Sequence, residues 1–295
     1  MSTTETTRST TPAPRERYRT VLASIIAGIY CLVLLAPASL IWPEPLARIM
    51  ATVKSSVYGL TGKLLIALGW QRPGIELQQG AYLMLVGLAV PLVAALLLLR
   101  ATPASLGFRS PNRTGWRLLV AGFVLTFPFL IFMAYGAGMR SYYLPAMKRA
   151  GTMPFLAYYA INMLTEHCLF HGVLLGAFRP TGRWPNSPPP APATPASGCC
   201  AGLRSWLGIG LVRVDPEPHA VAAWLGLAPA CGYAIVASGM LFALVHVGKD
   251  WREAALSLPG GIAIAYVAFR GNSLLIPLLL HALTAGTTLA LMLLW

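Results

Sequence analysis

The sequence predicts an all-α protein, a polytopic transmembrane helical bundle of about seven to eight spans. Of its 295 residues, 56% are hydrophobic and only 11% are charged, which is unlike soluble globular domains. The apolar residues gather in runs long enough to cross a bilayer. Most Lys and Arg residues, the source of the net charge of +13, stand between these runs. This pattern favours contact with a lipid bilayer and predicts no nucleic-acid partner.

The amino-terminal part contains a tail, a first span and a surface helix. Residues 1–19 are rich in Ser, Thr and Pro, and this composition predicts a disordered cytoplasmic tail. The apolar run 20–42 is longer than the apolar part of a usual signal peptide, so we expect an uncleaved first span. Residues 50–70 include Lys54 and Lys63 among apolar residues, which predicts an amphipathic helix at the membrane surface.

The remaining spans follow from apolar runs separated by short basic segments. They are predicted at 81–99, 118–135, 154–179, 224–247, 254–269 and 274–295. We therefore treat 20–295 as a single transmembrane domain. Its one long interruption, 180–198, is rich in Pro and Ala and is predicted to be a loop insertion that forms no packed core.

One of these runs carries polar residues that are costly inside a membrane. Glu166 stands in the middle of 154–179, and Asn162, four residues earlier, lies on the same face of a helix. His167 and His171 are also four residues apart, on the adjoining face. A carboxylate near the bilayer centre costs several kcal/mol, so this group predicts a functional site.

Two further histidines, His246 and His281, lie in two other apolar runs. Three spans with His, one of them also with Glu166, favour a shared polar site over separate structural histidines. A buried carboxylate acts as a general base on water, and a neutral His orients that water or donates to an oxyanion. Peptide hydrolysis inside a membrane needs these groups. A metal site uses the same residue types, so both readings stay open at this point.

The motifs around these residues resemble those of the CPBP family of intramembrane glutamic proteases, which includes the type II CAAX prenyl endopeptidases and the Abi group. The family motif E-E-x-x-F-R-G corresponds to EHCLFHG at 166–172, and F-x-x-x-H corresponds to 242–246. The motif H-x-x-x-N begins at His281 and is preceded, as in the family, by a stretch that starts at 271–273. Residues 106–109 are similar to a loop that the family often carries. Three motifs in order on three spans make this resemblance more specific than any one of them.

The resemblance implies a catalytic core at 153–295 that uses no metal and no cofactor. It implies that Glu166 is the general base, that His246 helps to hold the water, and that His281 polarises the scissile carbonyl or stabilises its oxyanion. The positions expected to support these residues are Asn162, His167, His171, Phe170, Phe242 and Thr284.

Three positions depart from the family pattern. His167 and His171 replace the Glu and Arg of the first motif, which are spaced to pair on one helix face, so we expect the two histidines to form a structural pair. Ala285 replaces the Asn of the third motif, which removes a donor from the expected oxyanion site. A hydroxyl of Thr284 or a neighbouring Thr is a candidate replacement.

The leading hypothesis is an intramembrane endopeptidase of glutamic type in a bacterial inner membrane. The expected substrates are membrane proteins or peptides: carboxyl-terminal sorting signals, peptides or CAAX-like tails. A metal-dependent membrane enzyme with His167, His171, His246 and His281 as ligands is the second hypothesis. A non-catalytic immunity or scaffold homologue, favoured by Ala285, is the third. The oligomeric state is left open.

Overall fold

The structure is a computed structural model that describes residues 44–69, 75–97, 102–175, 229–247 and 249–294. The predicted tail at 1–19, the first span at 20–42 and the insertion at 180–198 lie outside the described residues. All regular elements in the described part of the chain are helices, which confirms the predicted all-α class.

The helices lie close to the predicted spans, with ends shifted by a few residues. In chain order they are α3 (Glu44–Ala67), α4 (Ile75–Tyr82), η2 (Leu83–Ala89), α5 (Val90–Leu97), η3 (Pro103–Leu106), α6 (Arg113–Ala134), α7 (Ala137–Ala150), α8 (Thr152–Glu166), η4 (His167–Leu174), α12 (Pro229–Leu244), α13 (Trp251–Gly271) and α14 (Leu275–Leu294). The elements η2 and η4 are π-helical, and each continues an α-helix without a break.

Four helices of the described residues are long and apolar enough to cross a membrane. They are Leu77–Leu97, Arg113–Ala134, Trp251–Gly271 and Leu275–Leu294. The continuous helix formed by α8 and η4 is of similar length, but it is not among them. Its polar residues, Glu166 above all, lower the mean hydropathy of the segment that is most important for the site.

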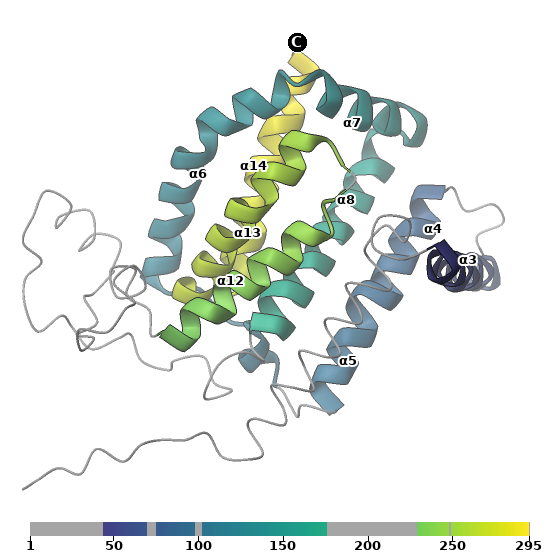
Figure 1. Ribbon diagram of the computed structural model, residues 1–295, viewed down its shortest axis with the longest axis horizontal. Helices are drawn as coiled ribbons and strands as arrows, with labels where there is room; N and C mark the ends of the chain where they lie inside the picture. Colours follow the sequence, from purple (N-terminus) through teal and green to yellow (C-terminus); the bar gives the residue numbers. More distant parts are fainter. Residues whose placement is uncertain (1–43, 70–74, 98–101, 176–228, 248, 295) are drawn as a thin grey trace, which may run out of the picture.

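The helix α3 runs across the direction of the other long helices. In Figure 1 it is seen nearly end-on, whereas α5, α6 and α14 extend along the plane of the picture. Its apolar side chains Ile49, Leu60 and Ile66 are more than half exposed. This orientation is consistent with the amphipathic surface helix predicted for 50–70.

A short loop was expected between the spans at 118–135 and 154–179, and this expectation is wrong. The connection is the 14-residue helix α7, which lies across one end of the bundle between α6 and α8 (Figure 1). Its sequence has no clear apolar period, and Pro145 lies within it, so the pattern did not indicate a helix. Tertiary packing of Met139, Tyr143 and Met147, all buried, holds it in place.

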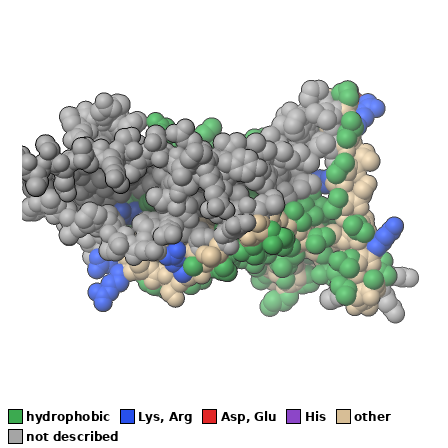
Figure 2. All heavy atoms as spheres, turned by 90° about the horizontal axis from the view of Figure 1, so that it is seen from below, with side chains coloured by type: hydrophobic (Ala, Val, Ile, Leu, Met, Phe, Trp, Pro, Cys, Tyr) green, Lys and Arg blue, Asp and Glu red, His purple; other side chains and the backbone are tan. Residues whose placement is uncertain are grey.

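The outer surface of the described helices is apolar, as a lipid environment requires. On α6, the side chains of Val120, Val124, Leu125 and Phe129 are all more than half exposed. Figure 2 shows hydrophobic side chains over much of the described part of one face, with Lys and Arg side chains toward its borders. Together with the apolar helices, this surface is that of an integral membrane protein.

Two loops that the family resemblance singled out bind each other below the bundle. Leu274 donates its backbone N–H to the carbonyl oxygen of Gly107 (2.9 Å), and Ser273 donates its hydroxyl to the carbonyl of Arg109 (2.6 Å). Gly172, the last residue of the first motif, lies against both loops: a Cβ there would be 3.1 Å from the Leu106 carbonyl oxygen. The backbone of η4, which carries two histidines, is therefore anchored by these loops.

The helices α12 and α13 cross in close contact at a pair of glycines. A Cβ on Gly239 would lie 2.7 Å from the backbone nitrogen of Ile262, and a Cβ on Gly261 would lie 2.8 Å from the ring of Phe242. Small residues allow such approach between membrane helices. This crossing sets the position of Phe242 and of the turn that follows α12.

We expect Gly239→Ala to destabilise the protein, because the new methyl group meets backbone atoms of α13 that have no room to move. Overpacking of this kind costs about 1–3 kcal/mol, or roughly 2–10 °C in melting temperature. Thermal unfolding in detergent measures the change. The control is Gly286→Ala on α14, where a Cβ meets nothing within 4 Å. Equal melting temperatures for the two variants would contradict the close crossing.

Candidate active site

Glu166 ends α8 and is buried, with 6% of its surface exposed. The Asn162 side chain, one turn earlier, donates from Nδ2 to Oε1 of Glu166 at 2.8 Å. No other hydrogen bond to this carboxylate is made by the described residues, so Oε2 is left free. The four-residue spacing recognised in the sequence thus produces the expected contact, and it holds one oxygen while leaving the other available.

The π-helical turn η4 follows directly and carries His167, Phe170 and His171, all of which are fully buried. The neighbouring helix comes close at this level, where a Cβ on Gly87 would lie 2.3 Å from Cγ2 of Thr165. The segment containing Gly87, η2, is itself π-helical. Such wide turns are rare and are found mostly at functional sites.

The histidines of η4 have different partners. Nε2 of His167 lies 3.0 Å from Nδ1 of His281 on α14, which is hydrogen-bonding distance. The ring of His171 is stacked obliquely beside that of His167, with centroids 5.0 Å apart. His171 approaches the backbone of Gly261, but neither of its ring nitrogens has a hydrogen bond of good geometry with the described groups. The expected pairing within η4 is therefore a ring contact, and the hydrogen bond runs to α14 instead.

His246 lies just past the end of α12, in a turn rather than in the helix. Its Nδ1 is 2.8 Å from the carbonyl oxygen of Phe242. Since a carbonyl only accepts, Nδ1 must carry the proton, and Nε2 of the neutral ring is then a free acceptor. The Phe242 ring, 4.5 Å away between centroids, supports the imidazole from the side.

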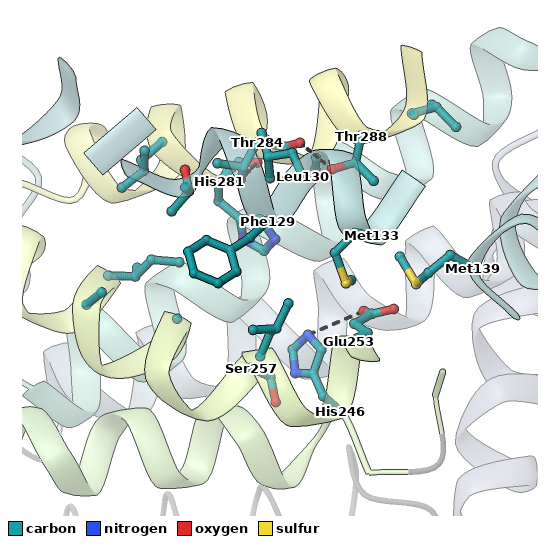
Figure 3. Close-up of a pocket in the computed structure, with 18 of the residues that line it drawn as sticks. Phe129, Leu130, Met133, Met139, His246, Glu253, Ser257, His281, Thr284 and Thr288 are labelled. Atoms are coloured by element: carbon teal, nitrogen blue, oxygen red, sulfur yellow. Dashed lines mark hydrogen bonds and ion pairs between the residues drawn. The ribbon is translucent and has the colours of Figure 1, made fainter. Parts of the chain in front are cut away.

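A cavity of about 430 Å³ opens between α6, α7, α8, α13 and α14. Figure 3 shows His246, Glu253 and Ser257 on one side of it and His281, Thr284 and Thr288 on the other. Most of the remaining lining is apolar, including Phe129 and Met133. A largely apolar cavity of this size with a few convergent polar groups is typical of a binding site for an organic ligand.

Glu166 is not among the residues that line this cavity, although His246 and His281 are. Its carboxylate nevertheless lies within electrostatic reach of both imidazoles and of Lys249. The three residues expected to be catalytic thus lie within electrostatic reach of one another, and two of them line the cavity.

A second carboxylate, which the sequence did not indicate, lies at the cavity. Glu253, 13% exposed in its side chain, accepts hydrogen bonds from the Tyr143 hydroxyl (3.0 and 2.9 Å) and from Nζ of Lys249 (2.8 Å). Burial lowers the pKa of Lys249, but the Glu253 and Glu166 carboxylates outweigh that effect and raise it above its ordinary value, so Lys249 stays charged. The four-residue spacing of Lys249 and Glu253 was a usable signal, but Glu253 stands one residue before the predicted span at 254–269.

Among the described residues, no three His, Cys, Asp or Glu side chains are arranged to hold a metal ion. The cavity is lined by His246 and His281 but not by His167 or His171. The geometry of these side chains therefore gives the hypothesis of a four-histidine metal site no support.

Residues 148–287 match the family described as type II CAAX prenyl endopeptidase Rce1-like. This segment is similar to that family. The match covers Glu166, both cavity histidines and Glu253, so the similarity applies to the site itself. No curated protein and no solved structure matches the chain.

Similarity to a CAAX-type endopeptidase family indicates a membrane-embedded protease, a hydrolase whose substrates are associated with the bilayer. The third motif also lies at this cavity, because Ala285 and the neighbouring Thr284 both line it. The Thr284 hydroxyl donates to the carbonyl of His281 in its own helix, and Thr288 donates to the carbonyl of Thr284. In this conformation both hydroxyl protons are engaged, and neither replaces the missing Asn.

We expect His167→Leu to lower peptide cleavage by this protein about tenfold or more. The substitution leaves Nδ1 of His281 without its partner, and an unsatisfied buried polar group costs about 1–3 kcal/mol. His167→Gln, which keeps a donor, is expected to retain more activity. Initial rates on a membrane-associated reporter peptide measure the effect, and Cys168→Ala, the adjacent buried position, serves as control. Wild-type rates in His167→Leu would show that the contact to His281 is unimportant.

Proposed function

We propose that this chain is an intramembrane endopeptidase of glutamic type, in which Glu166 is the general base that activates water. The observation that supports this role best is the state of its carboxylate. One oxygen is fixed by Asn162 at 2.8 Å and the other is free to accept a proton, while His246 and His281 are within electrostatic reach. A fixed orientation with one free oxygen is what a general base requires.

The proposed reaction uses one water molecule. A water held by the Glu166 carboxylate and by Nε2 of His246 attacks the scissile carbonyl carbon, and its proton passes to Glu166. The carbonyl oxygen becomes an oxyanion, stabilised by a hydrogen bond from His281. The proton then moves from Glu166 to the leaving nitrogen, the oxyanion re-forms the carbonyl as the C–N bond breaks, and the products are a carboxylic acid and an amine.

The contact between His167 and His281 supports this role for His281. If His167 donates from Nε2, then Nδ1 of His281 accepts, and a neutral His281 carries its proton on Nε2. That nitrogen is the one left to face the cavity. The proposed tautomers thus give an acceptor at His246 for the water and a donor at His281 for the oxyanion.

For the substrate, we propose membrane-associated peptides or proteins: carboxyl-terminal sorting signals, peptides or CAAX-like tails. The proposed location is a bacterial inner membrane. The apolar lining of the cavity supports a substrate with large apolar side chains near the cleaved bond, because charged residues would be desolvated there without partners.

The test is cleavage of candidate substrates of these kinds in cells, with wild-type protein, Glu166→Gln and His246→Ala at matched expression. We expect Glu166→Gln to lower cleavage about a hundredfold or more, which is the usual contribution of a general base. Glu44→Gln, the same change at an exposed position of α3, should cleave like wild type.

Two results would reject this proposal. Unchanged cleavage in Glu166→Gln would leave the family relationship as one of fold alone, as in a scaffold or immunity protein. Stoichiometric metal in the purified protein that disappears in His167→Ala would favour the metal-dependent enzyme instead.

A gain of activity is expected from Ala285→Asn. Ala285 lines the cavity one turn after His281, so an amide there adds a donor to the proposed oxyanion site. One such donor is worth about a hundredfold or more in established enzymes, and we expect at least a tenfold rise in initial rate. Ala290→Asn, at an exposed position of α14, is the control. A rate that stays the same or falls would argue against an oxyanion at this position.

A further inference from the structure

Glu253 and His246 lie next to each other on one side of the cavity, and the sequence motifs assign Glu253 no role. Its Oε1 lies 3.7 Å from Nε2 of His246, the ring nitrogen that the Phe242 carbonyl leaves free. Figure 3 shows the two side chains pointing toward each other. The side chains of both are well shielded, at 13% and 5% exposure.

The partners of Glu253 argue against a role as general base. Tyr143 donates to both of its oxygens, and Lys249 donates to Oε1. Both oxygens of this carboxylate are therefore already occupied by donors from the protein. Glu166 has a single hydrogen bond to one oxygen. The two carboxylates near His246 thus differ in their partners: both oxygens of Glu253 accept hydrogen bonds, whereas only Oε1 of Glu166 does so among the described residues.

His246 needs a fixed partner because the regular helix has already ended. The helix α12 stops at Leu244, and the turn that follows is held by the backbone bonds of His246 to Ala243 and of Lys249 to His246. Glu253 lies on the next helix, α13, and it is held from a third, α7, by Tyr143. This arrangement links the turn carrying His246 to side chains of both α13 and α7.

We propose that Glu253 is a positioning residue that holds the His246 imidazole at the cavity and stabilises positive charge that develops on it. The inference rests on the proposed function, in which Nε2 of His246 binds the attacking water. While one proton of the water passes to Glu166, the other stays hydrogen-bonded to Nε2 of His246. Accepting that bond places partial positive charge on the imidazole, and a fixed anion at 3.7 Å favours that charge. Lys249 opposes this effect, so the pair formed by Lys249 and Glu253 sets how readily His246 becomes protonated.

The charged and titratable groups around His246 come from every neighbouring element. They are Glu166 on α8, Lys249 in the same turn, Glu253 on α13 and His281 on α14. Removing an anion from this set should lower the titration midpoint of His246, and removing a cation should raise it. A purely structural role of the pair would not produce opposite shifts.

The experiment is a histidine-selective ¹³C NMR titration of the full chain in detergent, with the His246 signal assigned through His246→Gln. Glu253→Gln keeps the shape of the side chain and one acceptor oxygen but removes its charge. We expect it to lower the titration midpoint of His246 by about one pH unit. Lys249→Met removes the opposing charge, and we expect it to raise the midpoint.

Midpoints that stay within about 0.3 pH unit of wild type, or that move the same way in both variants, would overturn the proposal. Because Lys249 is partly exposed, at 22% of its side chain, Lys249→Met tests the proposal even where Glu253→Gln does not fold. Melting temperatures measured on the same samples identify such a failure.

The same variants connect the inference to catalysis. In Glu253→Gln we expect kcat to fall about tenfold with KM little changed, and the acid limb of the pH profile to move to lower pH. Should Glu166→Gln cleave like wild type, the proposed function fails, while the NMR titration still decides whether Glu253 controls His246. If the His246 midpoint shifts but kcat does not change, then Glu253 interacts with His246 without affecting catalysis. That result would overturn the role proposed here.

Discussion

The burial of a carboxylate among apolar helices is the physical constraint that most of the site's polar contacts help to offset. Glu166 loses its hydration on burial, and the bundle replaces that hydration with one amide hydrogen bond and the nearby charge of Lys249. Every polar group brought in for this purpose needs partners of its own. Lys249 donates to Glu253, and Glu253 also accepts from Tyr143. The two loops beside η4 bind each other next to the segment that follows Glu166. Polar groups from α7, α8, α13 and α14 therefore gather in one region, although almost everything around them is apolar.

Much of this arrangement was predictable because membrane helices constrain a sequence strongly. The apolar runs gave the helices, and the four-residue spacing of Asn162 and Glu166 gave their contact. The motifs gave the histidines that converge from three segments. The expectation failed where packing overrides local pattern. The helix α7 lacks an apolar period, and the hydrogen bond of His167 to His281 joins positions more than a hundred residues apart, which no spacing rule on one helix reveals.

Glu253 was missed for a related reason. At the end of a span, a charged residue is usually read as the border between membrane and water, and that reading explains it without any partner. Only the fold brings Tyr143 of α7 and the turn after α12 to the same carboxylate. The substitution of both charged residues of the first family motif by histidine has a clearer account in the structure. The positions are fully buried, and one of the two new imidazoles gains a partner on α14.

The residues of the site are divided between two lengths of chain on either side of 176–228. The first contributes Glu166 and Tyr143, and the second contributes His246, Glu253 and His281. The two lengths meet through helix packing, through the loop bonds at Gly107 and Arg109, and through the contacts of Glu253 and His281. Neither length by itself holds both a base and the imidazoles that would serve it. Formation of the bundle and formation of the site are consequently one event, and a peptide chain still being inserted into the membrane carries no competent protease.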